Sequence, residues 1–146
     1  MNNKSLSSET LHVSCVAVKG RAVLISGRSG SGKSDLALRL IDRGALLVSD
    51  DYTMVRRVDG RLLANAPENI QGKIEVRGIG LLEFETASDM PICLVVDLDR
   101  DVERLPPERE MMKIAGVSVP LVAANALEAS APVKVEAALH HFGLRP

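Results

Sequence analysis

Aromatic residues are scarce in this sequence, and long apolar runs are absent. Its 146 residues include one tyrosine, two phenylalanines and no tryptophan. The core must therefore be aliphatic, and there is almost no material for the aromatic platforms on which single-stranded nucleic acids stack. No apolar run approaches the roughly 20 residues that a membrane-spanning helix needs. We therefore expect neither a nucleic-acid partner nor a membrane partner.

Charge and cysteine content limit the expected partners and cellular location of the protein. The formal net charge is −1, from 18 basic and 19 acidic residues, which does not favour a general surface for nucleic acid or anionic lipid. Cys15 and Cys93 are too few and too far apart for a disulfide framework or a zinc site, and both lie in apolar runs. The first ten residues lack the apolar segment of a signal peptide. We expect a cytoplasmic protein with buried, reduced thiols.

The chain length predicts one domain over residues 1–146. Apolar residues make up 46% and charged residues 25%, which is ordinary for a soluble globular protein. Residues 1–8 are polar, and we expect this terminus to be flexible.

The most informative segment is a glycine-rich loop over residues 27–34. It matches the phosphate-binding pattern G-x-x-x-x-G-K-S/T at every fixed position. An apolar run at 22–25 predicts a buried strand before the loop, and helical spacing at 35–41 predicts a helix after it. Such loops bind phosphate through backbone N–H groups and the positive end of the helix. The residues expected to bind nucleotide are Gly27, Arg28, Ser29, Gly30, Ser31, Gly32, Lys33, Ser34 and Asp35.

Two residues of this loop have expected roles in chemistry. Lys33 should reach the outer phosphates of a nucleotide, and the Ser34 hydroxyl should ligate Mg²⁺. The alternative is a glycine-rich turn that matches the motif by chance, but the strand before the loop and the helix after it disfavour that alternative.

The rest of the chain predicts strands joined by tight turns. We expect one hairpin from residues 10–18 and the strand at 22–25, and a second from 52–55 and 62–64 around Asp59-Gly60. Further expected elements are strands at 45–48, 73–77, 92–97 and 117–122, and helices at 108–114 and 130–141. Pro120 should place its strand at a sheet edge. The predicted fold is an α/β domain with a phosphate loop, a mixed sheet with hairpins and two to three helices.

Two acidic positions could complete a site around the phosphate loop. Asp97 ends an apolar strand and could bind the metal, or it could cap the turn that follows. Asp50 and Asp51 end the strand that follows the helix of the phosphate loop. In a strand–helix–strand crossover both strands end at the same edge of the sheet, which places this strand end beside Ser34. Their alternative is a solvated turn at the start of a hairpin. The residues by themselves leave both sites open.

Five separate blocks resemble the catalytic domain of bacterial HPr kinase/phosphorylase. They are residues 27–35, 38–44, 47–51, 66–70 and 74–80, and the last is similar to the family signature E-I-R-G-L-G-I. A histidine on the strand before the phosphate loop belongs to the pattern, and His12 stands there. The resemblance runs from about His12 to Leu81.

The resemblance implies a kinase that uses ATP and Mg²⁺ to phosphorylate a serine of the phosphocarrier protein HPr. It favours the Asp50-Asp51 pair and implies that Asp51 takes the proton from the seryl hydroxyl. Asp50 and His12 would form a supporting pair beside it. Glu75 would help Ser34 to hold the metal, and Arg77 belongs to the same signature.

The sequence departs from the family in two places. Full-length members carry an additional N-terminal domain, so these 146 residues resemble the short, single-domain form. Longer members also carry a late arginine-containing loop implicated in phosphorolysis, and the corresponding residues 121–130 contain neither arginine nor lysine. We therefore expect kinase activity, and not phosphorolysis of phosphoserine-HPr at a comparable rate. A homo-oligomer is compatible with the sequence.

Two other functions compete with the HPr kinase. A small-molecule kinase with the same loop usually needs arginines in a lid, and Arg100, Arg104 and Arg109 are the candidates. A nucleotide-binding regulatory protein would transfer no phosphate. Binding alone needs no proton acceptor, so the presence of both Asp50 and Asp51 argues against that regulator.

Overall fold

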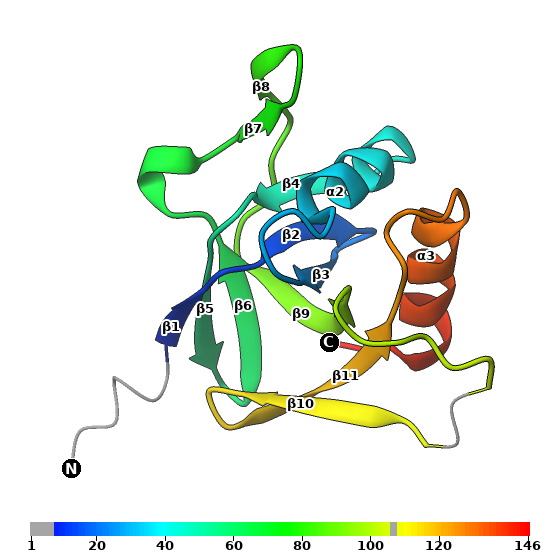
Figure 1. Ribbon diagram of the computed structural model, residues 1–146. Helices are drawn as coiled ribbons and strands as arrows, with labels where there is room; N and C mark the ends of the chain where they lie inside the picture. The colour runs from blue at the N-terminus through cyan, green and yellow to red at the C-terminus, as the bar shows by residue number, and fades with distance from the viewer. Residues whose placement is uncertain (1–7, 106–107) are drawn as a thin grey trace.

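A computed structural model describes residues 8–105 and 108–146 (Figure 1). The flexible terminus expected at 1–8 lies outside the described residues except for Ser8, which begins a strand. In chain order the elements are β1 (Ser8–Leu11), β2 (Ser14–Val18), β3 (Arg21–Ser26), α2 (Lys33–Asp42), β4 (Leu46–Ser49), β5 (Thr53–Val58), β6 (Arg61–Asn65), the 3₁₀ turn η1 (Glu68–Ile70), β7 (Lys73–Val76), β8 (Gly80–Glu83), β9 (Met90–Asp97), β10 (Glu110–Ile114), β11 (Val117–Ala123) and α3 (Ala131–Phe142).

Nine strands form one curled mixed sheet, with the order β1-β5-β6-β9-β3-β2-β4 and with β11 joining β9 to β10. The long strand β9 runs parallel to β3, pairs with β6 at its start and with β11 at its end. Strand β2 lies between β3 and β4 and is antiparallel to both. Strands β3 and β4 are therefore parallel, so the chain leaves both at the same edge of the sheet.

The two faces of the sheet bury separate aliphatic clusters because successive side chains of a strand alternate between faces. Helices α2 and α3 cover one face, against Val16, Val23 and Ile25. The other face is covered by the curled arms of the sheet, including Val55 from β5 and Val119 from β11. This arrangement confirms the predicted aliphatic core and mixed α/β fold.

The two cysteines lie in these clusters, one on each face, and both thiols are free and buried. Burial raises the pKa of the Cys93 thiol to about 11, and burial also raises the pKa of Cys15. Both thiols are therefore protonated near neutral pH. Their burial confirms the sequence prediction. Within the described residues, no helix is long and apolar enough to cross a membrane.

Both predicted hairpin turns are confirmed, and the turn of the second has positive φ at Asp59 and Gly60. The single strand expected at 10–18 is wrong: the chain bends at His12 and forms β1, which pairs with β5, and β2, which pairs with β3. The helix predicted at 108–114 is wrong: residues 110–114 form strand β10. Glutamate, methionine and lysine are good helix formers, but pairing with β11 across a turn with positive φ at Ala115 and Gly116 overrides that preference.

The edge position predicted for Pro120 is also wrong. Strand β10 covers that side of β11, so β10 forms the sheet edge. The pairing of β11 with β9 begins at Leu121, one residue after the proline. The missing N–H of Pro120 is therefore not needed for that ladder.

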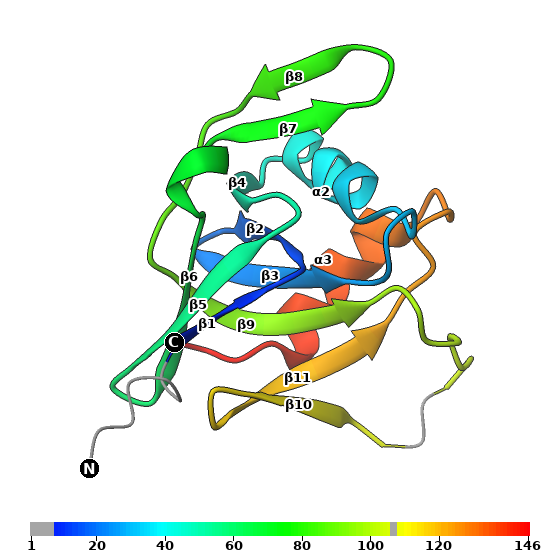
Figure 2. The same ribbon diagram turned by 60° about the vertical axis from the view of Figure 1, so that its left-hand side comes forward.

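Strands β7 and β8 form a separate two-stranded sheet that projects from the body next to α2 (Figure 2). The strand expected at 73–77 is confirmed as β7, which is followed by a turn at Gly78. The side chain of Ile74 is buried and anchors the hairpin, whereas the side chains of β8 are exposed.

Candidate active site

The phosphate loop links the end of β3 to the start of α2, and its glycines are required by local sterics. A Cβ on Gly27 would lie 2.4 Å from Ser31 Oγ. Gly32 has φ +101°, and a Cβ there would lie 2.9 Å from the Cβ of Ala126. At Gly32 the positive φ and the contact with Ala126 both favour glycine, whereas at Gly27 a side chain would have to displace the Ser31 hydroxyl.

Lys33 is folded back over this loop. The residue is 6% exposed, and Nζ donates hydrogen bonds to the carbonyl oxygens of Gly27 (2.6 Å) and Arg28 (3.1 Å). These contacts hold a buried cation over the loop, where it can exchange a carbonyl partner for a phosphate oxygen. The chemistry of the loop therefore fits an anionic ligand.

Two more features of the loop suit a phosphate chain. Of the residues that the structure describes, none caps the first turn of α2 with its side chain, so the N–H groups of this turn are available to an anion. The hydroxyl of Ser31 is buried and has no hydrogen-bond partner among the described residues. Both features leave hydrogen-bond donors that can bind phosphate oxygens.

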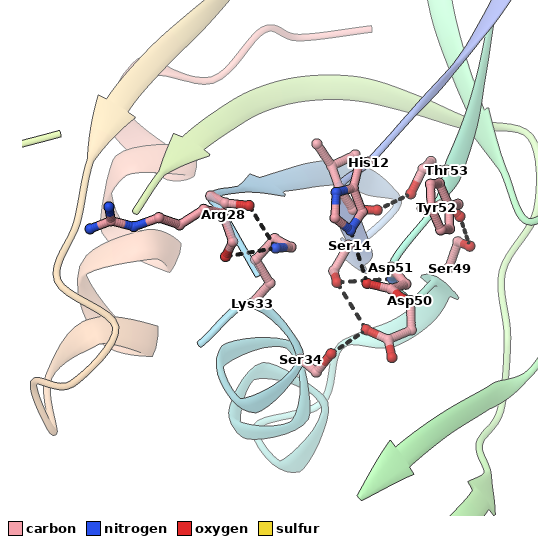
Figure 3. A network of polar contacts seen from close by, with 12 residues as sticks. His12, Ser14, Arg28, Lys33, Ser34, Ser49, Asp50, Asp51, Tyr52 and Thr53 are labelled. Atoms are coloured by element: carbon pink, nitrogen blue, oxygen red, sulfur yellow. Dashed lines mark hydrogen bonds and ion pairs between the residues drawn. The ribbon is translucent and has the colours of Figure 1, made fainter. Parts of the chain in front are cut away.

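An acidic corner faces this loop from the end of β4 (Figure 3). Ser34, in the first turn of α2, donates from Oγ to Asp50 Oδ1 at 2.7 Å. Ser14 at the start of β2 donates to the same oxygen at 2.9 Å. The crossover predicted that Asp50 would lie beside Ser34, and this distance confirms that prediction.

Asp51 adopts an unusual backbone conformation in this corner. Its φ is +69°, and the N–H of Tyr52 donates to the carbonyl of Asp50 at 2.8 Å. A hydrogen bond from residue i+2 to residue i around a positive φ defines a γ-turn of the rare, strained type. Strain of this kind persists only where the surroundings determine the conformation, and it is concentrated at functional sites.

His12 contacts the carboxylate of Asp51. Nε2 lies 3.2 Å from Asp51 Oδ1, and the imidazole stacks on the ring of Tyr52 with centroids 4.8 Å apart. The resemblance implied a pair of His12 with Asp50, and the structure pairs His12 with Asp51. The reason is that Oδ1 of Asp50 is turned toward the hydroxyls of Ser14 and Ser34.

The loop and the acidic corner line one open cleft of about 550 Å³. The β7 segment forms another part of the wall and brings Glu75 and Arg77 to the same cleft. The expected nucleotide-binding residues that line it are Ser29, Gly30, Gly32, Lys33, Ser34 and Asp35. Arg28 points away from the acidic corner in Figure 3, and its backbone N–H donates to Asp99 at 2.9 Å.

The alternative acid, Asp97, is used in a turn. Its two carboxylate oxygens accept from the N–H of Asp99 (2.9 Å) and from Nε of Arg100 (3.2 Å). This is the capping role that the sequence left open. Arg100 also pairs with Glu110, and Arg109 stacks over the ring of Phe142. Two of the three candidate lid arginines are thus engaged outside the cleft.

Comparison with known proteins gives the family. The model of the HPr serine kinase C-terminal domain matches residues 4–145. The chain belongs to the HPr serine kinase C-terminal domain family. Among curated relatives, the HPr kinase/phosphorylase of Clostridium beijerinckii is 39% identical over 127 residues, which cover 78% of this chain and 42% of that protein. That of Chlorobium limicola is 39% identical over 125 residues, covering 76% of this chain and 38% of that protein.

A solved structure of the same family also matches. The HPr(Ser) kinase/phosphatase of Coxiella burnetii superposes with a TM-score of 0.78 at 26% identity, over 90% of this chain and 94% of that one. The fold expected from the resemblance to this family is therefore confirmed. The chain spans about two fifths of the length of the two curated HPr kinase/phosphorylases.

The sequence did not single out Ser14. The Ser14 hydroxyl contacts both acidic residues of the corner. It donates a hydrogen bond to Asp50 and accepts one from the backbone N–H of Asp51 at 3.2 Å. A signal for Ser14 was present in the sequence. It lies two residues after His12 within the strand expected at 10–18, and residues two apart on a strand point to the same side. In the structure the chain bends at His12, and β2 begins at Ser14.

Proposed function

We propose that this chain is a protein kinase that transfers the γ-phosphate of ATP to a serine of HPr. The observation that carries the proposal is the chain of contacts from the phosphate-loop serine, Ser34, through Asp50 and Ser14 to the backbone of Asp51. It joins a phosphate-binding loop to a carboxylate that can accept a proton. The names of the relatives in Clostridium beijerinckii and Chlorobium limicola support HPr as the substrate protein.

In this proposal Asp51 acts on the seryl hydroxyl of HPr that receives the phosphate. A seryl hydroxyl is a weak nucleophile, so a carboxylate within hydrogen-bond reach orients it and accepts its proton. The bond from the seryl oxygen to the γ-phosphorus forms while the bond to the β–γ bridging oxygen breaks, and ADP leaves. The Asp51 carboxylate is 62% exposed, which leaves it accessible to a protein substrate, and His12 holds one of its oxygens.

Lys33 serves the phosphates. We propose that Nζ leaves the carbonyls of Gly27 and Arg28 and contacts the oxygens of the outer phosphates, where its positive charge stabilises the transferring group. The N–H groups at the start of α2 contribute in the same direction.

Ser34, Asp50 and Glu75 are the residues that would hold Mg²⁺. Mg²⁺ usually binds one or two carboxylates together with phosphate oxygens and water, and a hydroxyl, an aspartate and a glutamate on one cleft suit that pattern. In the described part of the chain no group of three or more histidine, cysteine or acidic side chains forms a metal site by itself, so phosphate oxygens would complete the coordination. The ion, when bound, supplies charge neutralisation on those oxygens.

The test is transfer of label from [γ-³²P]ATP to HPr in the presence of Mg²⁺, followed by phosphoamino-acid analysis. The unaltered chain should label serine of HPr, and Asp51→Asn should lower the rate by about 100-fold or more because the proton acceptor is lost. Asp59→Asn is the matched control, since Asp59 is also an exposed aspartate with positive φ but lies in the β5–β6 turn.

Three outcomes would contradict the proposal. Binding of ATP without labelling of any acceptor would indicate a regulatory protein. Turnover with a small acceptor while HPr remains unlabelled would indicate a small-molecule kinase. Equal rates for Asp51→Asn and Asp59→Asn would remove the proposed role of Asp51.

A further inference from the structure

Ser14 lies at the centre of the acidic corner and is completely buried. Its hydroxyl donates to Asp50 Oδ1 at 2.9 Å and accepts the backbone N–H of Asp51 at 3.2 Å. A hydroxyl has one proton to donate and two lone pairs to accept with, and here the proton and one lone pair serve adjacent residues. Both bonds are partly buried, and the loss of a hydrogen bond in such surroundings leaves a polar group with less access to water.

The bond from Ser14 to Asp50 fixes the orientation of the Asp50 carboxylate. Oδ1 accepts from Ser14 and from Ser34 at the same time. The two hydroxyls approach from different elements, β2 and α2, so their shared acceptor has one orientation that satisfies both. Ser14 thereby holds the carboxylate of Asp50 against the start of the phosphate-loop helix.

The bond to Asp51 stabilises a conformation that the residue does not favour by itself. Its φ of +69° is strained for a residue with a side chain, and its exposed carboxylate has little packing to hold it. Two further bonds brace the turn: Ser49 Oγ donates to the carbonyl of Tyr52, and Thr53 Oγ1 donates to the carbonyl of Val13 at 2.9 Å. Only the Ser14 hydroxyl bonds the backbone N–H of Asp51 among the bonds described.

We propose that Ser14 is a positioning residue for phosphoryl transfer. It touches neither the nucleotide nor the acceptor, and it acts through the two aspartates. By bonding the side chain of Asp50 and the backbone of Asp51, it fixes the distance between the phosphate-loop serine and the proton-accepting carboxylate. The proposal rests on the proposed kinase function, and displacement of a reacting group by about 1 Å lowers rates by about 100-fold.

The test uses three variants at this position. Ser14→Ala should lower kcat for transfer to HPr by about 10- to 100-fold, while KM for ATP stays within about threefold because the phosphate loop keeps its own contacts. Ser14→Thr keeps the hydroxyl and should retain kcat within about threefold of the unaltered chain. Ser14→Val has the shape of Thr without the hydroxyl, and it should behave like Ser14→Ala.

Thermal unfolding of each variant is measured in parallel. A purely structural role would lower the stability of Thr and Val alike and leave kcat per folded molecule unchanged. Equal kcat for Ser14→Thr and Ser14→Val, or unaltered kcat for Ser14→Ala, would overturn the proposal.

A second measurement needs no substitution and no activity. The Asp51 N–H should exchange with solvent deuterons far more slowly than the N–H of exposed Asp59, because a buried hydroxyl accepts its hydrogen bond. Exchange of Asp51 at the rate of an unstructured amide would overturn the proposal even if the Ala and Val variants fail to fold. If the unaltered chain does not label HPr, the proposed kinase function fails, and the exchange rate still decides whether Ser14 holds Asp51.

Discussion

The cleft has two walls that are built in different ways. The acidic corner belongs to the large sheet, and its hydroxyls at Ser14, Ser49 and Thr53 are completely buried and hydrogen-bonded. The β7–β8 hairpin is a sheet of its own, anchored by the buried Ile74, with Ile79 72% exposed at its tip. One wall is held by buried polar contacts, and the other projects into solvent.

The two walls suit different tasks. The acidic corner suits the positioning of reacting groups, and the hairpin suits the entry of ligands. Residues that act on a reacting group must be held in place, and rigid elements with satisfied hydrogen bonds do that best. A segment with few buried apolar contacts opens at low free energy, which suits an element that ligands must pass. We therefore expect substitutions at the corner and the phosphate loop to reduce the rate strongly, and substitutions on the hairpin to act weakly or on metal affinity alone.

The largest expected effect is at Lys33. Lys33→Ala should lower kcat for transfer by about 1,000-fold, because a buried cation that stabilises developing charge is lost. Lys73→Ala removes an exposed lysine from the hairpin wall and should leave kcat within about twofold. The labelling assay with HPr measures both, and near-normal turnover by Lys33→Ala would mean that the phosphate loop is wrongly assigned.

A pair of glycines compares the stability of the two walls. Gly32→Ala introduces a side chain at φ +101° and a clash with Ala126, whereas Gly78→Ala has φ +85° and nothing within 4 Å. The positive φ should lower the free energy of unfolding by about 1–2 kcal/mol in each, and the clash should add about 1–3 kcal/mol to the loss for Gly32→Ala. Urea unfolding measures the difference, and equal losses would contradict the packing of the loop against Ala126.

Glu75 tests whether the hairpin wall contributes to the metal. Glu75→Gln should raise the Mg²⁺ concentration at half-maximal rate by roughly tenfold while kcat changes little, since loss of a group that supports a metal site lowers affinity by about 10- to 100-fold. Glu83→Gln is the control, because Glu83 lies on β8 opposite Lys73. An unchanged Mg²⁺ dependence in Glu75→Gln would assign the metal to the acidic corner alone.

The smallest expected effect is at the tip of the hairpin. Ile79→Ser should change the free energy of unfolding by less than about 0.5 kcal/mol, because an exposed side chain loses little on replacement. Urea unfolding of this variant checks the result. A loss above 1.5 kcal/mol, on the order of that for burying a whole aliphatic side chain, would show that the tip packs against the body and that the two walls are not so different.

The sequence predicted best where a short motif determines the geometry. The phosphate loop and the hairpin at Asp59-Gly60 follow from local turn chemistry. The position of Asp50 beside Ser34 follows from a crossover between parallel strands, whose ends lie at the same edge of the sheet. Strand β10 could not be predicted, because its helix-forming residues become a strand only through pairing with β11. Tertiary pairing overrides local preference in such segments.

The details of the acidic corner were also beyond the sequence. The roles of Ser14 and the partner of His12 depend on which oxygen of Asp50 faces which strand, and on the γ-turn at Asp51. Asp-Gly predicts a positive φ at Asp59, but no such turn motif stands at Asp51. Its conformation is stabilised by tertiary contacts, the hydrogen bonds of the Ser14, Ser49 and Thr53 hydroxyls in and beside the turn.

A crystal structure of this chain with Mg²⁺ and a non-hydrolysable ATP analogue tests most directly whether Asp51 faces the transferred phosphate. The terminal phosphate should lie against Lys33 Nζ, and Asp51 should face the open side of the terminal phosphorus, about 3 Å from the position of an acceptor hydroxyl. A triphosphate bound outside the cleft, or one bound in the loop with Asp50 and Asp51 directed away from the terminal phosphorus, would contradict this prediction.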